Sequence, residues 1–200
     1  MLLGVRARHV VAALDKVSVL LLDLELREHG FLGTPLYMAF AFSRINEAQR
    51  HDMPELHEMR ERAVDPDGNC LFRAASVALS GEFRLPKHAE DARARELRGE
   101  VVKFIRLNKG SFVSFLPEGR DFDEYTSTMA NESVWGGELE VSAIARLHRR
   151  PVHVYIRTET KYVLLSQYPA GSQDCGDKIS LLFHGRHYDA LFEPLLQSTE

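Results

Sequence analysis

The fold is decided by one stretch of this sequence, residues 65–76, which reads Asp65-Pro66-Asp67-Gly68-Asn69-Cys70-Leu71-Phe72-Arg73-Ala74-Ala75-Ser76. It begins as a turn, because Asp-Pro and Asp-Gly dipeptides break regular structure. It continues as a helix, because residues 71–79 are rich in helix formers and carry an apolar face. Cys70 therefore stands where a turn becomes a helix.

This position favours the thiolate form of Cys70. The first backbone N–H groups of a helix have no partner within the helix, and the helix dipole adds partial positive charge there. Cysteine pKa values of about 3.5–7.5 occur in such settings. The position thus predicts a lowered pKa and a nucleophilic thiol. On position alone, a small buried hydrophobic residue at a helix start is an equally good interpretation.

The composition is that of an ordinary soluble domain. Of 200 residues, 44% are hydrophobic and 27% charged, and a formal net charge of −4 argues against a nucleic-acid binder that relies on phosphate contacts. The two cysteines, Cys70 and Cys175, form neither a disulfide framework nor a zinc tetrad, which fits a reducing compartment. We find no convincing signal peptide and no run of about 18 uncharged residues, the length of a membrane span. A cytoplasmic or nuclear location is expected.

Helices are expected in the first three quarters of the chain. Residues 1–45 read as a helical extension, either an extra helical layer or a partner- or membrane-binding surface, and residues 46–200 as the main domain. The charged segment 46–63 is predicted to hold a helix that starts near Pro54, and a longer helix is predicted over 88–108. The basic residues of the longer helix alternate with acidic ones, so they read as its solvated side rather than as a nucleic-acid patch. They are Arg93, Arg95, Arg98, Lys103 and Arg106.

Strands are expected in the last quarter. Residues 152–156 and 162–165 are β-rich, and residues 179–183 and 187–192 read as a hairpin across a short turn. Helices first and strands last indicate the α+β class, with a small sheet packed among helices.

His187 and Asp189 are the best partners for Cys70 among the titratable residues. A cysteine nucleophile needs a base, and the base needs a group that orients it. Residues i and i+2 of a strand share a face, so Asp189 can hold one imidazole nitrogen of His187 and leave the other for Cys70. A His-x-Asp pair by itself is more often a surface pair; together with Cys70 the catalytic interpretation is favoured.

Three segments, in this order, resemble the ovarian-tumour (OTU) family of cysteine proteases, which are deubiquitinases: residues 67–73, 135–140 and 187–189. The resemblance covers residues 55–194 and implies an OTU-like α+β fold with a small, mostly antiparallel sheet between helices. It implies Cys70 as nucleophile, His187 as general base and Asp189 as its orienter. It also implies that Asp67 shapes an oxyanion loop, in which the amides of Gly68, Asn69 and Cys70 could converge on the developing charge. Neither a cofactor nor a metal is expected.

The segment of Trp135, Gly136, Gly137 and Glu138 is expected to lie near the substrate. Ubiquitin ends in Gly-Gly, and a protease that cuts after this pair needs a channel too narrow for side chains. Two adjacent glycines leave room for a second backbone. The arginines of the ubiquitin tail could meet one of several acidic residues, among which the sequence does not choose: Glu118, Asp121, Asp123, Glu124, Glu132 or Glu138.

The resemblance therefore implies a deubiquitinase that hydrolyses (iso)peptide bonds after the C-terminal glycine of ubiquitin or a ubiquitin-like modifier. The partners expected are ubiquitin, polyubiquitin or such a modifier. Two alternatives stay open: a catalytically silent ubiquitin-binding module with the same fold, and a cysteine hydrolase acting on a small molecule.

Overall fold

The computed structural model describes residues 59–116, 119–159, 161–169 and 177–193. The expected extension 1–45, most of the expected helix 46–63, Glu118 and Cys175 lie outside these residues. Within the described part, no helix is both long enough and apolar enough to cross a membrane.

The described elements follow the expected order. The helices are α4 (Cys70–Ser80), α5 (Lys87–Leu107), α6 (Lys109–Phe112), α7 (Phe122–Met129) and α8 (Glu138–His148), with a 3₁₀ helix η2 (Val113–Phe115). The strands are β1 (Arg60–Arg62), β2 (Val152–Arg157), β3 (Tyr162–Tyr168), β4 (Ile179–Phe183) and β5 (Tyr188–Phe192). The two helices predicted at 71–79 and 88–108 and the strands predicted after residue 150 are confirmed.

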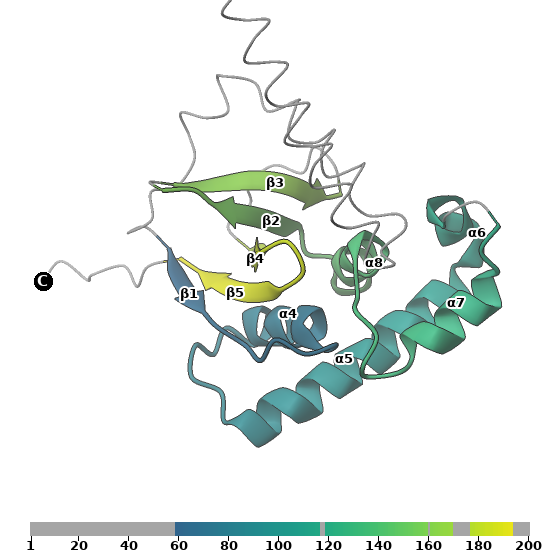
Figure 1. Cartoon of the computed structure of the whole chain (residues 1–200), viewed down its shortest axis with the longest axis horizontal. Coiled ribbons are helices and arrows are strands. Elements are labelled where there is room, and N and C mark those ends of the chain that lie inside the picture. Colours follow the sequence, from purple (N-terminus) through teal and green to yellow (C-terminus); the bar gives the residue numbers. More distant parts are fainter. Residues whose placement is uncertain (1–58, 117–118, 160, 170–176, 194–200) are drawn as a thin grey trace, which may run out of the picture. The chain divides into compact units, whose positions relative to one another are not determined.

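The strands form one sheet in the order β1-β5-β4-β2-β3 (Figure 1). Neighbouring strands run antiparallel except β2 and β4, which run parallel. Helix α4 packs against β4 and β5, α8 packs against β2 and β3, and α5 packs against α4, α7 and α8. The predicted α+β class, with a small and mostly antiparallel sheet among helices, is confirmed.

Helix α4 is the centre of this packing. Every residue from Cys70 to Ala78 is buried, including Arg73 and Ser76, whereas the sequence predicted a single apolar face. The helix is enclosed because both the sheet and α5 pack against it. It ends at Gly81, whose φ of 69° is the left-handed conformation that glycine adopts without steric cost. Cys70, the first residue of α4, is thus held in place by the packing of α4 against the sheet and α5.

Residues 60–62 correct the prediction of a helix within the segment 46–63. They form β1, which pairs antiparallel with β5, with Arg60 opposite Phe192 and Arg62 opposite Ala190. A triplet of charged residues has little strand propensity of its own, so the strand owes its existence to the edge of β5. Its consequence is local: the chain passes directly from β1 into the turn before Cys70.

Candidate active site

The turn before Cys70 is folded around the carboxylate of Asp67. Asp67 Oδ1 accepts a hydrogen bond from the Asn69 amide at 2.9 Å, and Oδ2 accepts one from the Arg73 guanidinium at 2.8 Å. Gly68 is required here, because a Cβ on it would lie 2.3 Å from the backbone carbon of Ser133. Asp67 is thus hydrogen-bonded to both the turn and α4, and its role in an oxyanion loop stays a prediction.

Two backbone amides of this loop already donate hydrogen bonds within the protein. The Asn69 amide donates to Asp67 Oδ1, and the Cys70 amide donates to the Asp67 carbonyl at 3.1 Å. An oxyanion would have to recruit either amide in competition with Asp67. Two of the three amides are thus already hydrogen-bonded in this structure, and their convergence on an oxyanion stays a prediction.

The expected low pKa of Cys70 is also wrong, because burial raises the pKa of its thiol above the ordinary value. Cys70 is only 2% exposed. The negative charges of Asp67 and Asp189 act in the same direction, while backbone hydrogen bonds from Tyr188 and Leu71 oppose them. Desolvation outweighs the favourable helix start. At neutral pH a base must therefore take the thiol proton as the sulfur attacks.

His187 and Asp189 make the contact that their spacing predicted. His187 lies immediately before β5, and its Nε2 is 2.9 Å from Asp189 Oδ1. The same oxygen accepts the amide of Val64, 2.8 Å away, so the chain that leaves β1 also anchors the carboxylate. Because a carboxylate accepts hydrogen bonds, Nε2 carries the proton and Nδ1 of the neutral ring is the basic nitrogen.

Nδ1 of His187 is buried and has no hydrogen-bond partner among the described residues. The next residue, Tyr188, hydrogen-bonds through its backbone to Cys70. Packing of α4 against β5 thus brings the cysteine and the histidine segment together. A buried nitrogen without a partner needs an explanation. The structure shows no hydrogen bond between Cys70 Sγ and His187 Nδ1, so the pairing of this thiol with this base stays a prediction.

His184 is a site residue that the sequence reasoning missed. Its Nε2 lies 3.2 Å from Asp189 Oδ2, and its ring stacks on that of His187 with centroids 6.2 Å apart. The main chain closes the same turn, because the His184 amide donates to the His187 carbonyl at 2.8 Å. The sequence does contain a signal for His184: it stands at the other end of the predicted hairpin turn from His187.

The glycines of the Trp135 segment are used differently from the prediction. A Cβ on Gly136 would lie 2.7 Å from Leu71 Cδ2, so the space beside Gly136 is filled by α4 rather than open to a substrate backbone. Gly137 is the extended N-cap residue before α8 and donates its amide to Glu140 Oε2 at 2.8 Å. Trp135 is half-buried in this segment.

Glu138 is an acidic residue of this segment whose charge acts on Tyr188. Burial raises the pKa of the Glu138 carboxyl, and a hydrogen bond from Tyr168 opposes this shift. The charge of Cys70 acts on Tyr188 in the same direction as that of Glu138. Other acidic candidates have partners of their own: Asp121 caps α7, Asp123 pairs with Lys109, and Glu132 accepts from Asn69.

Comparison with known proteins agrees with this architecture. The model of the OTU-like cysteine protease family matches residues 65–190. The chain is 29% identical over 135 residues to OVARIAN TUMOR DOMAIN-containing deubiquitinating enzyme 6 of Arabidopsis thaliana, across 66% of this chain and 24% of that enzyme. The chain thus spans about a quarter of the length of this relative.

Solved structures of two related domains share the fold. The OTUD1 OTU domain matches with a TM-score of 0.56 at 22% identity, over 79% of this chain and 99% of that one. The Hazara virus OTU, solved bound to ubiquitin, matches with a TM-score of 0.53 at 21% identity, over 72% of this chain and 88% of that one.

Proposed function

This chain belongs to the family of OTU-like cysteine proteases, and from that premise we propose that it is a deubiquitinase. It hydrolyses (iso)peptide bonds after the C-terminal glycine of ubiquitin or a ubiquitin-like modifier. The similar Arabidopsis thaliana protein is named as a deubiquitinating enzyme, and the similar Hazara virus domain was solved bound to ubiquitin. Both support ubiquitin as the substrate class.

The observation that carries the proposal is the buried, unpartnered Nδ1 of His187. Asp189 holds the opposite nitrogen of the ring, and Tyr188 joins the segment to Cys70. Since burial keeps Cys70 protonated, the base must act during the attack. We assign this role to His187, because Asp189 holds its Nε2 and Nδ1 is left to accept the proton.

The proposed reaction has two halves. Cys70 Sγ forms a bond to the glycine carbonyl carbon while the thiol proton passes to His187 Nδ1. Collapse of the oxyanion breaks the C–N bond, His187 protonates the leaving amine, and ubiquitin stays attached to Cys70 as a thioester. Water then gives a proton to His187 and attacks the thioester. Collapse releases the ubiquitin carboxylate, and Cys70 recovers its proton from His187.

The roles of the remaining predicted residues follow from their neighbours. Asp189 orients His187 and balances the imidazolium that forms during attack. Asp67 holds the loop of Gly68 and Asn69 whose amides we propose to stabilise the oxyanion, once they exchange Asp67 for the substrate oxygen. Trp135 and Glu138 are proposed to contact the substrate tail, with Gly136 and Gly137 shaping their segment rather than opening a channel.

One observation favours the alternative of a silent ubiquitin-binding module, namely the raised pKa of the Cys70 thiol. A cysteine that stays protonated would bind substrate without cleaving it. The alternative differs from the enzyme in a single measurable property, the formation of a covalent bond at Cys70.

A ubiquitin probe with a C-terminal electrophile separates the two functions. We expect covalent labelling that requires Cys70, is lost in Cys70→Ala, falls strongly in His187→Ala and persists in Cys175→Ala. Hydrolysis of a fluorogenic ubiquitin substrate should follow the same order. Tight binding of ubiquitin without labelling would support the silent module, and neither binding nor labelling would contradict both.

A further inference from the structure

Arg98 of α5 is a cation in the core, with 2% of its surface exposed. The sequence grouped it with the solvated basic residues of this helix, and the structure corrects that prediction. A buried charge is costly unless hydrogen bonds satisfy it. Burial lowers the pKa of its guanidinium, a shift opposed by the charges of Glu140 and Glu132. The fold tolerates this cost close to the candidate nucleophile, where Arg73 is a second buried cation.

Two hydrogen bonds join Arg98 to the turn before Cys70. Nη2 donates to the Gly68 carbonyl at 2.6 Å, and Nε donates to Asn69 Oδ1 at 2.9 Å. Asn69 is the N-cap residue of α4, yet its side chain makes no capping hydrogen bond to the helix. Asn69 is oriented by Arg98 instead.

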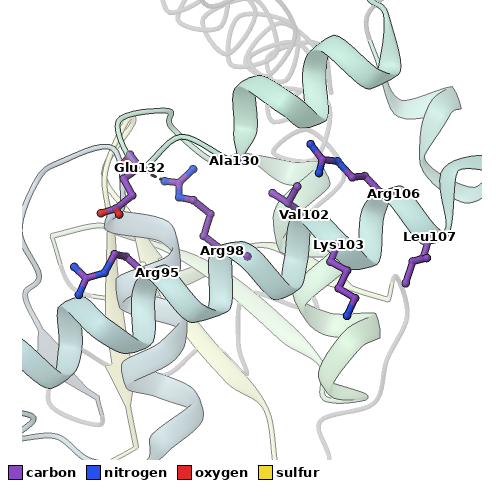
Figure 2. Close-up of a pocket in the computed structure, with 9 residues that line it drawn as sticks. Arg95, Arg98, Val102, Lys103, Arg106, Leu107, Ala130 and Glu132 are labelled. Carbon is purple, nitrogen blue, oxygen red and sulfur yellow. Dashed lines mark hydrogen bonds between the residues drawn. The ribbon is translucent and has the colours of Figure 1, made fainter.

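Further hydrogen bonds join Arg98 to the segment that leads to Trp135. Nη1 donates to the Met129 carbonyl at 2.9 Å, and Nη2 donates to the Val134 carbonyl at 2.9 Å and the Glu132 carbonyl at 3.3 Å. Figure 2 shows Arg98 extending from α5 toward the loop of Ala130 and Glu132. One planar guanidinium therefore ties two loops together, which the single ammonium of a lysine could not reproduce.

Arg98 and Asp67 hold opposite ends of the same peptide group. The Gly68 carbonyl points to Arg98, and the Asn69 amide of that planar unit points to Asp67 Oδ1. Flanking glycine backbone can rotate easily, so this peptide could otherwise flip. Because both the carbonyl and the amide of the Gly68–Asn69 peptide are hydrogen-bonded, the orientation of the backbone just before Cys70 is fixed.

We propose that Arg98 is a positioning residue for the hydrolysis: it locks the Gly68–Asn69 peptide against the 129–134 segment and so fixes Cys70 and the adjacent oxyanion loop. The inference rests on the proposed function. Arg98 does not touch the substrate; it acts through the turn. Its loss should therefore lower kcat more than it weakens ubiquitin binding, because the turn that it holds carries Cys70, whereas its hydrogen bonds reach neither Trp135 nor Glu138.

The test compares Arg98→Gln, Arg98→Lys and Arg95→Gln in a Cys175→Ala background. Arg95 is the matched control, because it lies on the same helix and, together with Arg98, lines a pocket of about 420 Å³. It is exposed and has no hydrogen bond or ion pair within the described residues. We expect folded Arg98→Gln to lose about 10²-fold in kcat, with KM changed far less, Arg98→Lys to recover part of it, and Arg95→Gln to match the parent.

A second readout does not depend on ubiquitin. The alkylation rate of Cys70 by iodoacetamide, measured against pH, should change in Arg98→Gln and not in Arg95→Gln, because the thiol environment moves with the turn. If Arg98→Gln does not fold, Asn69→Ala replaces it; this variant removes one Arg98 contact and should also lower kcat.

Parental kcat and an unchanged alkylation profile in folded Arg98→Gln, or in Asn69→Ala, would overturn the positioning role. A parent protein that neither labels nor cleaves ubiquitin would instead overturn the proposed function. In that case the alkylation profile still decides whether Arg98 positions Cys70.

Discussion

His184 Nε2 lies 3.2 Å from Asp189 Oδ2, so the carboxylate that holds His187 also holds a second imidazole. Asp189 is the meeting point of three segments: Oδ1 receives the Val64 amide and His187, and Oδ2 faces His184. Orientation of the proposed base thus depends on more than the His-x-Asp pair. The His184 side chain is more exposed than that of His187. We therefore expect the loss of His184 to reduce activity less than the loss of His187.

We expect His184→Ala to lower kcat/KM only about fivefold or less, because an exposed pair contributes about 0.2–1 kcal/mol. The His184 side chain is 40% exposed, and Asp189 Oδ1 keeps both of its other partners. The measurement is kcat/KM on a fluorogenic ubiquitin substrate, with the exposed His88→Ala as a control. A loss as large as that of Asp189→Ala would make His184 indispensable to the site.

Asp189→Asn should be less damaging than Asp189→Ala. The asparagine oxygen can still accept from His187 and Val64, whereas the negative charge beside the imidazolium is lost. We expect a loss near the 10²-fold end of about 10²–10⁴ for general acid–base effects. Asp189→Ala should cost more, because the ring can then rotate. Steady-state kinetics of both variants against His187→Ala provide the test, and parental activity in both would assign the orientation of His187 to another residue.

Cys70 should make the folded protein less stable in alkaline solution. Burial raises the folded-state pKa of the thiol above the unfolded value of about 8.5. Below the unfolded value the thiol is protonated in both states. As pH rises past it, the unfolded chain loses the proton more readily, so the free energy of unfolding falls until the folded-state pKa is reached.

Urea unfolding of the Cys175→Ala protein with and without Cys70→Ala, from pH 7 to pH 10, checks this sign. The stability of the Cys70 protein relative to the alanine variant should be constant near neutrality and should decline at alkaline pH. A relative stability that rises with pH would mean that the folded protein favours the thiolate, and that the helix start outweighs burial after all.

The parts of the site that could be predicted from sequence depend on local geometry. Cys70 at the start of a helix and the spacing of His187 and Asp189 need only the turn chemistry and the period of a strand. The pKa of Cys70 depends on what packs over it, and no local pattern contains that information. The sequence predicts helix where β1 forms. Its charged triplet has no strand pattern of its own, and it becomes a strand by pairing with β5.

The burial of Arg98 has a signal in the sequence. Arg98 lies four residues after Ala94 and four before Val102, and both are buried. Helical spacing therefore places Arg98 on the apolar stripe of α5, apart from Arg95 and Lys103, which are exposed. What periodicity cannot provide is the identity of its partners, since the loops at Gly68 and Val134 reach it only in the folded chain.

Gly68→Ala and Gly99→Ala should change stability in opposite directions. A Cβ at Gly68 would lie 2.3 Å from backbone atoms of Ser133, which cannot move without displacing the segment that Arg98 holds. We expect a destabilisation of about 1–3 kcal/mol or more from this overpacking, with lower kcat. Gly99, within α5, has open space beside it, and alanine there should stabilise by about 0.5–1 kcal/mol at unchanged activity. Urea unfolding and kinetics of both variants test the pair. A stable and active Gly68→Ala would show that the 68–133 approach is not a constraint on the site.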